Sequence, residues 1–104
     1  MDFAHYIGGE WVADTEITTN TSPANRDDVI GTYARGGAAR VDEAVSAAKD
    51  ALSGWAAASP QIRHDVLERA GALIVERKDE LGHLLARGEG KTIAEATGET
   101  IRAA

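Results

Sequence analysis

The chain has 104 residues, of which 43% are hydrophobic and 27% are charged; 17 acidic residues against 11 basic ones give a net charge of -6. This composition is typical of a folded domain or a part of one, and it excludes an intrinsically disordered chain. The acidic balance argues against a surface for nucleic acid or anionic membranes, since either needs a basic stripe. The sequence holds no cysteine, which excludes a disulfide framework and a thiol nucleophile within these residues.

The chain shows no sign of a targeting or membrane segment. Its first residues carry neither the basic region nor the apolar run of a signal peptide, and no window approaches the ~20 apolar residues of a membrane span. We therefore expect a cytoplasmic protein.

The first third of the chain is expected to form a small sheet. Residues 5–12 (HYIGGEWV) place two short apolar runs around Gly8-Gly9, the pattern of a hairpin with a two-residue turn. Residues 15–21 and 29–34 are rich in β-branched and apolar side chains and predict further strands, separated by a loop at 22–28. Because a two-stranded ribbon is marginal in water, the hairpin must pack against another element.

The segment 38–55 predicts a first helix that organises the rest of the chain. One apolar stripe recurs at spacings of three and four, formed by Val41, Ala44, Val45, Ala48, Leu52 and Trp55. The helix is expected to begin near Gly37 or Ala38 without a side-chain cap, and Arg40 places a positive charge at the positive end of its dipole, a small penalty. A stripe of small residues allows a flat partner surface to approach closely.

A second helix is predicted from Ser59, which can cap it, and Pro60, which suits the first helical position. Gly71 lies in its middle, where close packing would explain a residue that costs ~1 kcal/mol relative to alanine. Its expected buried face consists of Ile62, Val66, Leu67, Ala70, Leu73 and Ile74.

Two more helices complete the prediction. Residues 76–90 carry an apolar side of Leu81, Leu84 and Leu85, and Thr92 with Glu95 has the spacing of a capping box that opens a fourth helix. The sequence then stops at Ala104 among strong helix formers, with no glycine, asparagine or proline to end the helix. We therefore expect that these residues belong to a longer parent chain.

The motifs that could carry chemistry favour structural roles. GEGKT at 88–92 lacks the first glycine of a phosphate loop, since Leu85 holds that position, and a helix precedes it instead of a strand. We read it as a break between helices, with Lys91 in solvent. His5, His64 and His83 are too scattered for the three or four converging ligands of a zinc site, and Trp11 and Trp55 are expected to anchor packing. The sequence therefore predicts no catalytic, cofactor-binding or metal-binding residue here.

The order of the segments resembles the opening of the aldehyde dehydrogenase superfamily. The resemblance rests on HYIGGEWV, then SPANRDDVIGTYARG, then VDEAVSAAKDALSGWAAASPQIRHDVLERAGALI, then ERKDELGHLLARGEGKTIAEATGE, from about His5 to Ala104. The RHDVL, ERKDELG and EGKT segments are most similar to bacterial 2-oxoglutarate-semialdehyde dehydrogenases. Ser22 replaces the usual asparagine before Pro23, and Gly88 interrupts a segment that is helical in the family.

The resemblance implies an α+β piece of an α/β fold, with a small N-terminal ribbon or sheet and about four helices, as part of the cofactor-binding domain. Residues 1–104 would be an incomplete N-terminal part, with small strands at 1–36 and a helical layer at 37–104. The parent would be a homo-oligomeric enzyme that oxidises an aldehyde with NAD or NADP, and its catalytic cysteine and glutamate would come later in the chain. This piece alone would bind no cofactor and be inactive, with the rest of the parent chain as its partner. The alternative from the residues alone is a free-standing, non-catalytic helical interaction module.

Overall fold

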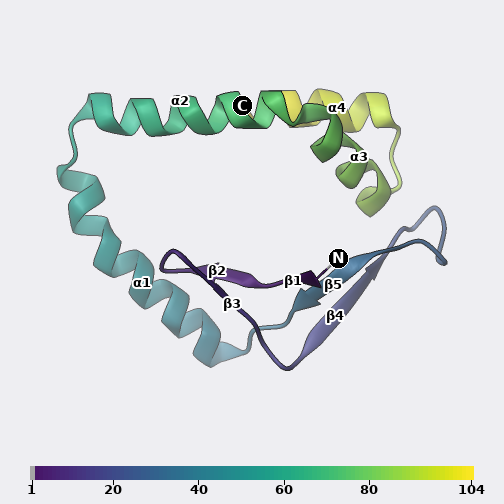
Figure 1. Ribbon diagram of the computed structural model, residues 1–104, viewed down its shortest axis with the longest axis horizontal. Coiled ribbons are helices and arrows are strands. Elements are labelled where there is room, and N and C mark those ends of the chain that lie inside the picture. Colours follow the sequence, from purple (N-terminus) through teal and green to yellow (C-terminus); the bar gives the residue numbers. More distant parts are fainter. Residues whose placement is uncertain (1) are drawn as a thin grey trace. The chain divides into compact units, whose positions relative to one another are not determined.

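The computed structural model describes residues 2–104, which form five short strands followed by four helices (Figure 1). The strands are β1 (Asp2–Phe3), β2 (His5–Ile7), β3 (Glu10–Val12), β4 (Ile17–Thr21) and β5 (Val29–Ala34), and the helices are α1 (Ala38–Ala57), α2 (Pro60–Glu76), α3 (Lys78–Glu89) and α4 (Ile93–Arg102). The expected strand-then-helix order is thereby confirmed. Among the described residues, no helix combines the length and the apolar character needed to cross a membrane.

The chain divides into two compact units. The first unit contains residues 1–20 and 31–58, and the second contains residues 21–30 and 59–104. The first therefore holds the hairpin, most of the three-stranded sheet and α1, whereas the second holds the 22–28 loop and the other three helices.

The β2–β3 hairpin turns through two glycines, as expected. Gly8 and Gly9 have φ of 61° and 90°, in the left-handed region that glycine adopts without a steric penalty. Tyr6 pairs with Trp11 across the strands, and their ring centroids lie 4.9 Å apart. Trp11 is nevertheless 74% exposed among the described residues, so its prediction as a packing anchor is wrong there. Its ring contacts that of Tyr6, which is itself 63% exposed.

The second sheet has the order β1-β5-β4. β1 runs parallel to β5, and the rings of Phe3 and Tyr33 stack at 4.5 Å between their centroids. Sequence reasoning missed β1, because two residues are too short to display an alternating pattern. The strands β4 and β5 and the loop between them lie where they were expected.

Helix α1 begins where its apolar stripe predicted. Gly37 caps it in an extended conformation without a side-chain hydrogen bond. No residue of α1 is buried, and Val41, Leu52 and Trp55 are 58%, 61% and 42% exposed. The stripe exists, but within the described residues it is largely uncovered; Trp55 is accordingly not a buried anchor either.

In the second unit, α2 is capped by Ser59, whose side chain accepts a hydrogen bond from the Ile62 N–H, and Pro60 is its first residue. A side chain at Gly71 would lie 3.2 Å from the Ala104 carbonyl oxygen, which confirms close packing at this glycine. The predicted buried face of α2 is wrong for the described residues, since Ile62, Val66 and Leu67 are each more than half exposed.

The small core of this unit lies between α3 and α4. Gly82 and Ala86 of α3, and Ala96 and Thr100 of α4, are buried. Ala96 is fully covered. Small side chains at these positions let the two helix backbones approach closely.

Candidate functional site

Helices α3 and α4 are joined by a turn at residues 90–92, which are the last three residues of the GEGKT segment. Gly90 ends α3 with φ of 71°, and its N–H donates to the Ala86 carbonyl. Thr92 begins α4 with both hydrogen bonds of the predicted capping box: Thr92 Oγ1 accepts from the Glu95 N–H, and the Glu95 carboxylate accepts from the Thr92 N–H. Residues 90–92 are a break between helices, as predicted, but Gly88 and Glu89 still belong to α3, so the expectation that Gly88 interrupts a helical segment is wrong.

The charge of Lys91, which lies in this turn, is compensated by carboxylates of the two flanking helices. Its Nζ lies 2.6 Å from Glu89 Oε2 and 2.6 Å from Glu99 Oε2. These two carboxylates raise the pKa of Lys91, and Lys91 lowers the pKa of Glu99. The expectation that Lys91 points freely into solvent is therefore wrong. An ammonium group held by two carboxylates, one at the end of α3 and one in α4, is poorly suited to bind a phosphate.

The 22–28 loop is held against the same turn. Arg87 Nε donates to Asp28 Oδ2 at 3.0 Å, and this pairing lowers the pKa of Asp28. A side chain at Gly90 would meet Pro23 Cγ at 2.9 Å. The contacts join residues more than fifty positions apart, so sequence spacing gave no signal for them. They brace a loop and place no two catalytic groups together.

The first unit contains a second charged cluster. Arg40 Nη2 lies 2.8 Å from Asp14 Oδ1, and Arg40 Nη1 pairs with Glu43. Hydrogen bonding from Arg40 lowers the pKa of Asp14, and the two carboxylates raise the pKa of Arg40. The positive charge near the start of α1, predicted to cost stability, is thus compensated by acidic partners.

His5 completes this cluster from β2. Its Nε2 lies 2.9 Å from Asp14 Oδ2 but makes no well-directed hydrogen bond, the one such buried side-chain nitrogen or oxygen within residues 2–104. The contact becomes an ion pair when the imidazole is protonated. No nucleophile lies in the cluster, so its chemistry supports attachment of β2 to α1.

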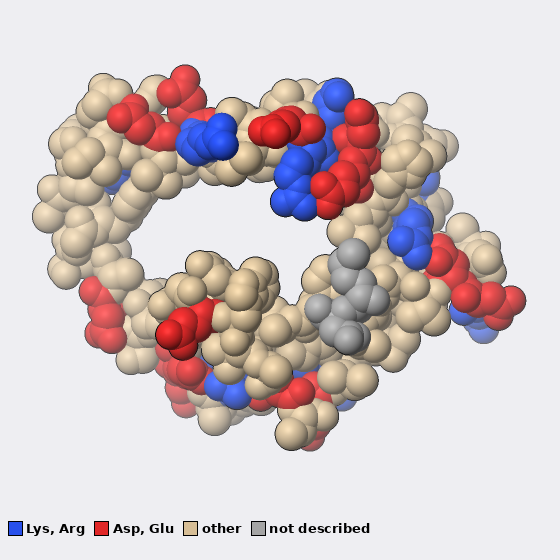
Figure 2. All heavy atoms as spheres, viewed as in Figure 1, with Lys and Arg blue, Asp and Glu red and all other residues tan. Residues whose placement is uncertain are grey.

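The other titratable pairs lie on exposed helix surfaces. His64, Asp65 and Glu68 form a triangle on α2, with potential ligand atoms within 4.8 Å of one another and all three side chains exposed. Asp79 pairs with Lys78, and Glu80 pairs with Arg77. On the face seen in Figure 2, basic side chains lie beside acidic ones and do not gather into a basic patch.

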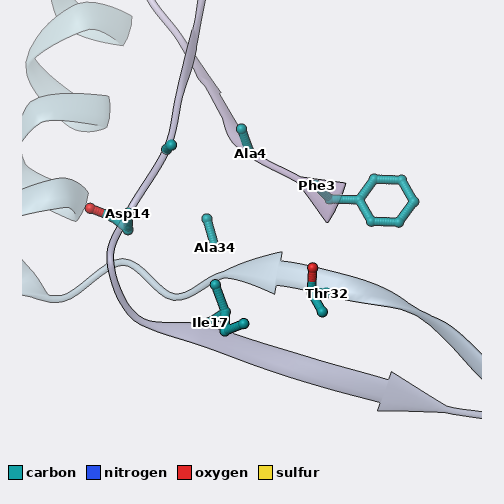
Figure 3. A pocket seen from close by; sticks show the side chains of 7 residues that line it. Phe3, Ala4, Asp14, Ile17, Thr32 and Ala34 are labelled. Carbon is teal, nitrogen blue, oxygen red and sulfur yellow. The ribbon is translucent and has the colours of Figure 1, made fainter. Parts of the chain in front are cut away.

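An apolar pocket of the first unit lies beside its sheet (Figure 3). It has a volume of about 320 Å³ and is lined by Phe3, Ala4, Ala13, Asp14, Ile17, Thr32 and Ala34. In Figure 3 the Asp14 carboxylate points toward the helix and away from the pocket, and Ile17 points toward Ala34. The pocket walls therefore offer apolar contact and little polar chemistry.

The sequence was compared with models of known protein families. The sequence model described as the aldehyde dehydrogenase family matches residues 11–104. The chain belongs to the aldehyde dehydrogenase family. This confirms the resemblance inferred from the order of its segments.

Individual members of the family show how much of such a protein the chain spans. It is 33% identical over 102 residues to 1-pyrroline-5-carboxylate dehydrogenase of Geobacillus sp. (strain WCH70), covering 98% of the chain and 20% of that protein. It is 39% identical over 101 residues to alpha-ketoglutarate semialdehyde dehydrogenase of Haloferax volcanii, covering 95% of the chain and 21% of that protein. The chain thus spans about one fifth of the length of the curated relatives it matches.

Solved structures of family members share the fold. The structure of 1-pyrroline-5-carboxylate dehydrogenase from Thermus with bound NAD aligns with a TM-score of 0.94 and 34% identity, over 98% of this chain and 20% of that one. An NAD-dependent aldehyde dehydrogenase from Sinorhizobium meliloti aligns with a TM-score of 0.91 and 28% identity, over 97% of this chain and 21% of that one. The fold is therefore that of one part of an aldehyde dehydrogenase.

Proposed function

We propose that this chain is the N-terminal scaffold segment of an NAD(P)-dependent aldehyde dehydrogenase, and that it is inactive by itself. The observation that carries the proposal is the alignment of 98% of the chain with a fifth of an NAD-bound relative at a TM-score of 0.94. Its role is to lie against the cofactor-binding part of the parent and brace it.

The parent reaction oxidises an aldehyde to its carboxylate. In the parent, an enzyme thiolate would add to the aldehyde carbon, NAD(P)⁺ would serve as the acceptor of the hydride that this carbon loses, and water would release the acid and regenerate the thiol. No cysteine occurs among the 104 residues, so the thiol must be supplied from outside them. Neither charged cluster of this chain takes part in the chemical step, because each is occupied by partners within its own unit.

The uncovered helix faces support the scaffold role over that of a free-standing interaction module. A module that folds alone covers its own apolar stripes, whereas Leu52, Ile62 and Leu67 are each 55% or more exposed. These side chains come from both units, so the need for a covering surface extends along the helical part of the chain.

A semialdehyde is the proposed substrate class, with 2-oxoglutarate semialdehyde as the first candidate. This rests on the sequence similarity to an alpha-ketoglutarate semialdehyde dehydrogenase and, at 38% identity over 100 residues, to a glutarate-semialdehyde dehydrogenase from Pseudomonas putida. The choice between NAD and NADP is left to the assay, because the residues that contact the cofactor are expected outside this segment.

The test is to express the complete reading frame that contains these residues and to follow formation of NADH or NADPH at 340 nm. We expect oxidation of 2-oxoglutarate semialdehyde, with glutarate semialdehyde as the comparison substrate. The 104-residue chain assayed at the same concentration should give no turnover. A complete frame that oxidises no aldehyde with either cofactor would refute the proposal, as would activity of the 104-residue chain alone.

A further inference from the structure

Strand β4 lies at one edge of the three-stranded sheet. In the order β1-β5-β4, one side of β4 pairs with β5, and within residues 2–104 no strand pairs with its other side. An open edge presents a row of unpaired backbone N–H and C=O groups, which is a template for another strand.

The direction of the backbone groups on β4 follows from a hydrogen bond next to the strand. The N–H of Arg35, the residue after β5, donates to the Glu16 carbonyl at 2.9 Å, so the backbone N–H and C=O of Glu16 point toward β5. Along a strand, the backbone N–H and C=O groups of successive residues point to alternate sides. The backbone groups of Thr18 therefore also point toward β5, while those of Ile17 and Thr19 point to the open edge.

Charged side chains and proline are two of the features by which proteins protect an exposed strand edge. The sequence of β4, ITTNT, contains neither a charged residue nor a proline. The opposite edge strand, β1, is protected by its length of two residues. Ile17 is 60% exposed and lines the apolar pocket of Figure 3, so an added strand would find apolar contact beside the backbone donors and acceptors.

We propose that the open edge of β4 is completed by a β-strand from the part of the parent polypeptide that lies outside these 104 residues. The inference rests on the proposed function. This chain covers 20% of the first relative's length, so four fifths of such a polypeptide are available to supply the strand. A strand of the same polypeptide pairs at a high effective concentration, which favours it over an edge from a second copy.

The test measures amide hydrogen exchange of the full-length protein at single-residue resolution. A completed edge protects Ile17, Thr18 and Thr19 alike, with exchange slowed on the order of 100-fold or more relative to an unstructured peptide. An open edge protects Thr18 and leaves Ile17 and Thr19 near the unstructured rate. Thr18 therefore serves as the internal control for folding of the sheet, and fast exchange at Ile17 and Thr19 beside a protected Thr18 overturns the inference.

Two further measurements are needed. The first distinguishes a strand of the same polypeptide from a second copy, and the second distinguishes failure of the edge-strand proposal from failure of the proposed function. Protection of Ile17 and Thr19 that disappears on dilution, while Thr18 stays protected, would assign the edge to a second copy and overturn the inference. Aldehyde oxidation is assayed on the same sample, so an active enzyme with an alternating pattern refutes the edge strand alone. A sample with continuous protection and no aldehyde oxidation would instead refute the proposed function, on which this inference rests.

Thr19→Pro in the full-length protein provides a variant test, with Thr15→Pro outside the strand as its control. Proline is tolerated in an edge strand where its missing N–H would face solvent. If the edge is completed, the N–H at position 19 is bonded to the added strand and proline removes that hydrogen bond. We expect Thr19→Pro to lower the thermal midpoint well below that of Thr15→Pro. Equal midpoints for the two variants would overturn the inference.

Discussion

Gly82 of α3 lies directly against Thr97 of α4. A Cβ at this position would lie 2.5 Å from Thr97 Oγ1 and 3.0 Å from Thr97 Cα. The hydroxyl can rotate away, but the backbone carbon cannot, so the helices themselves would have to separate. Glycine is retained here for space, despite its unfavourable helix propensity.

Gly82→Ala should therefore destabilise the protein although alanine favours the helix. Overpacking costs about 1–3 kcal/mol and the gain in propensity is about 1 kcal/mol, so we expect a net loss of about 1 kcal/mol or more in the free energy of unfolding. Urea denaturation of the variant and of the unchanged protein measures this net loss.

Gly88→Ala in the same helix is the matched control. No atom lies within 4 Å of a Cβ at Gly88, so this substitution should stabilise the protein by about 0.5–1 kcal/mol. Equal effects of the two substitutions would contradict the packing argument.

At the scale of the element, the stability of α4 depends on Thr92, the residue that caps its N-terminus. The Thr92 hydroxyl accepts from the Glu95 N–H at 3.3 Å and donates to the Glu95 carboxylate at 2.8 Å. Thr92→Ala should lower the free energy of unfolding by about 1 kcal/mol. Thr92→Ser, which keeps the hydroxyl, should lower the free energy of unfolding by only a small part of that amount. Chemical denaturation of both variants measures the two losses.

The 22–28 loop is attached to α3 by a charge pair whose strength depends on pH. Arg87 holds the pKa of Asp28 below its ordinary value, so the ionised carboxylate is favoured in the folded protein. The resulting stability is present above the unfolded pKa of about 3.9 and is lost as the pH falls through the lower folded pKa.

Asp28→Asn should accordingly lower the thermal midpoint at pH 7 and have a progressively smaller effect below about pH 4. Asp27→Asn, next to it in the loop, removes a charge without removing the Arg87 pair and should show no such convergence. Thermal melts between pH 7 and pH 2.5 test this, and a difference for Asp28→Asn that stays constant with pH would rule out the pair as its source.

Elements whose signals are local could be predicted from the sequence. Gly8-Gly9 marks a turn, Ser59-Pro60 marks a helix start, and Thr92 with Glu95 marks another, because each acts within a few residues. The ion pairs Asp14–Arg40 and Asp28–Arg87 could not be predicted, since their members are 26 and 59 positions apart in the sequence. Periodicity placed the apolar stripes of α1 and α2 correctly but could not say what covers them.

At the scale of the whole molecule, the exposed apolar side chains are the dominant feature. Val45 and Leu52 of α1 and Val66 and Leu67 of α2, for example, are each between 47% and 64% exposed. A surface of this kind in isolation binds hydrophobic dyes and promotes association.

We therefore expect the 104-residue chain to bind 8-anilinonaphthalene-1-sulfonate strongly and to melt over a broad range. The full-length protein should bind much less dye per molecule and unfold cooperatively. Fluorescence titration of both at equal molar concentration makes the comparison. A sharp melting transition of the short chain without dye binding would favour the free-standing module instead.

The environment of Lys91 has a consequence for chemical labelling. The chain has three lysines, Lys49, Lys78 and Lys91. Only an unprotonated amine attacks an acylating reagent. This form is scarcer at Lys91, because its two carboxylate neighbours raise its pKa, and the Lys91 side chain is only 21% exposed. A succinimidyl ester at limiting concentration should therefore modify Lys49 before Lys91, as peptide mapping would reveal, so a fluorophore or cross-linker can be placed on α1 while the turn between α3 and α4 is left unmodified.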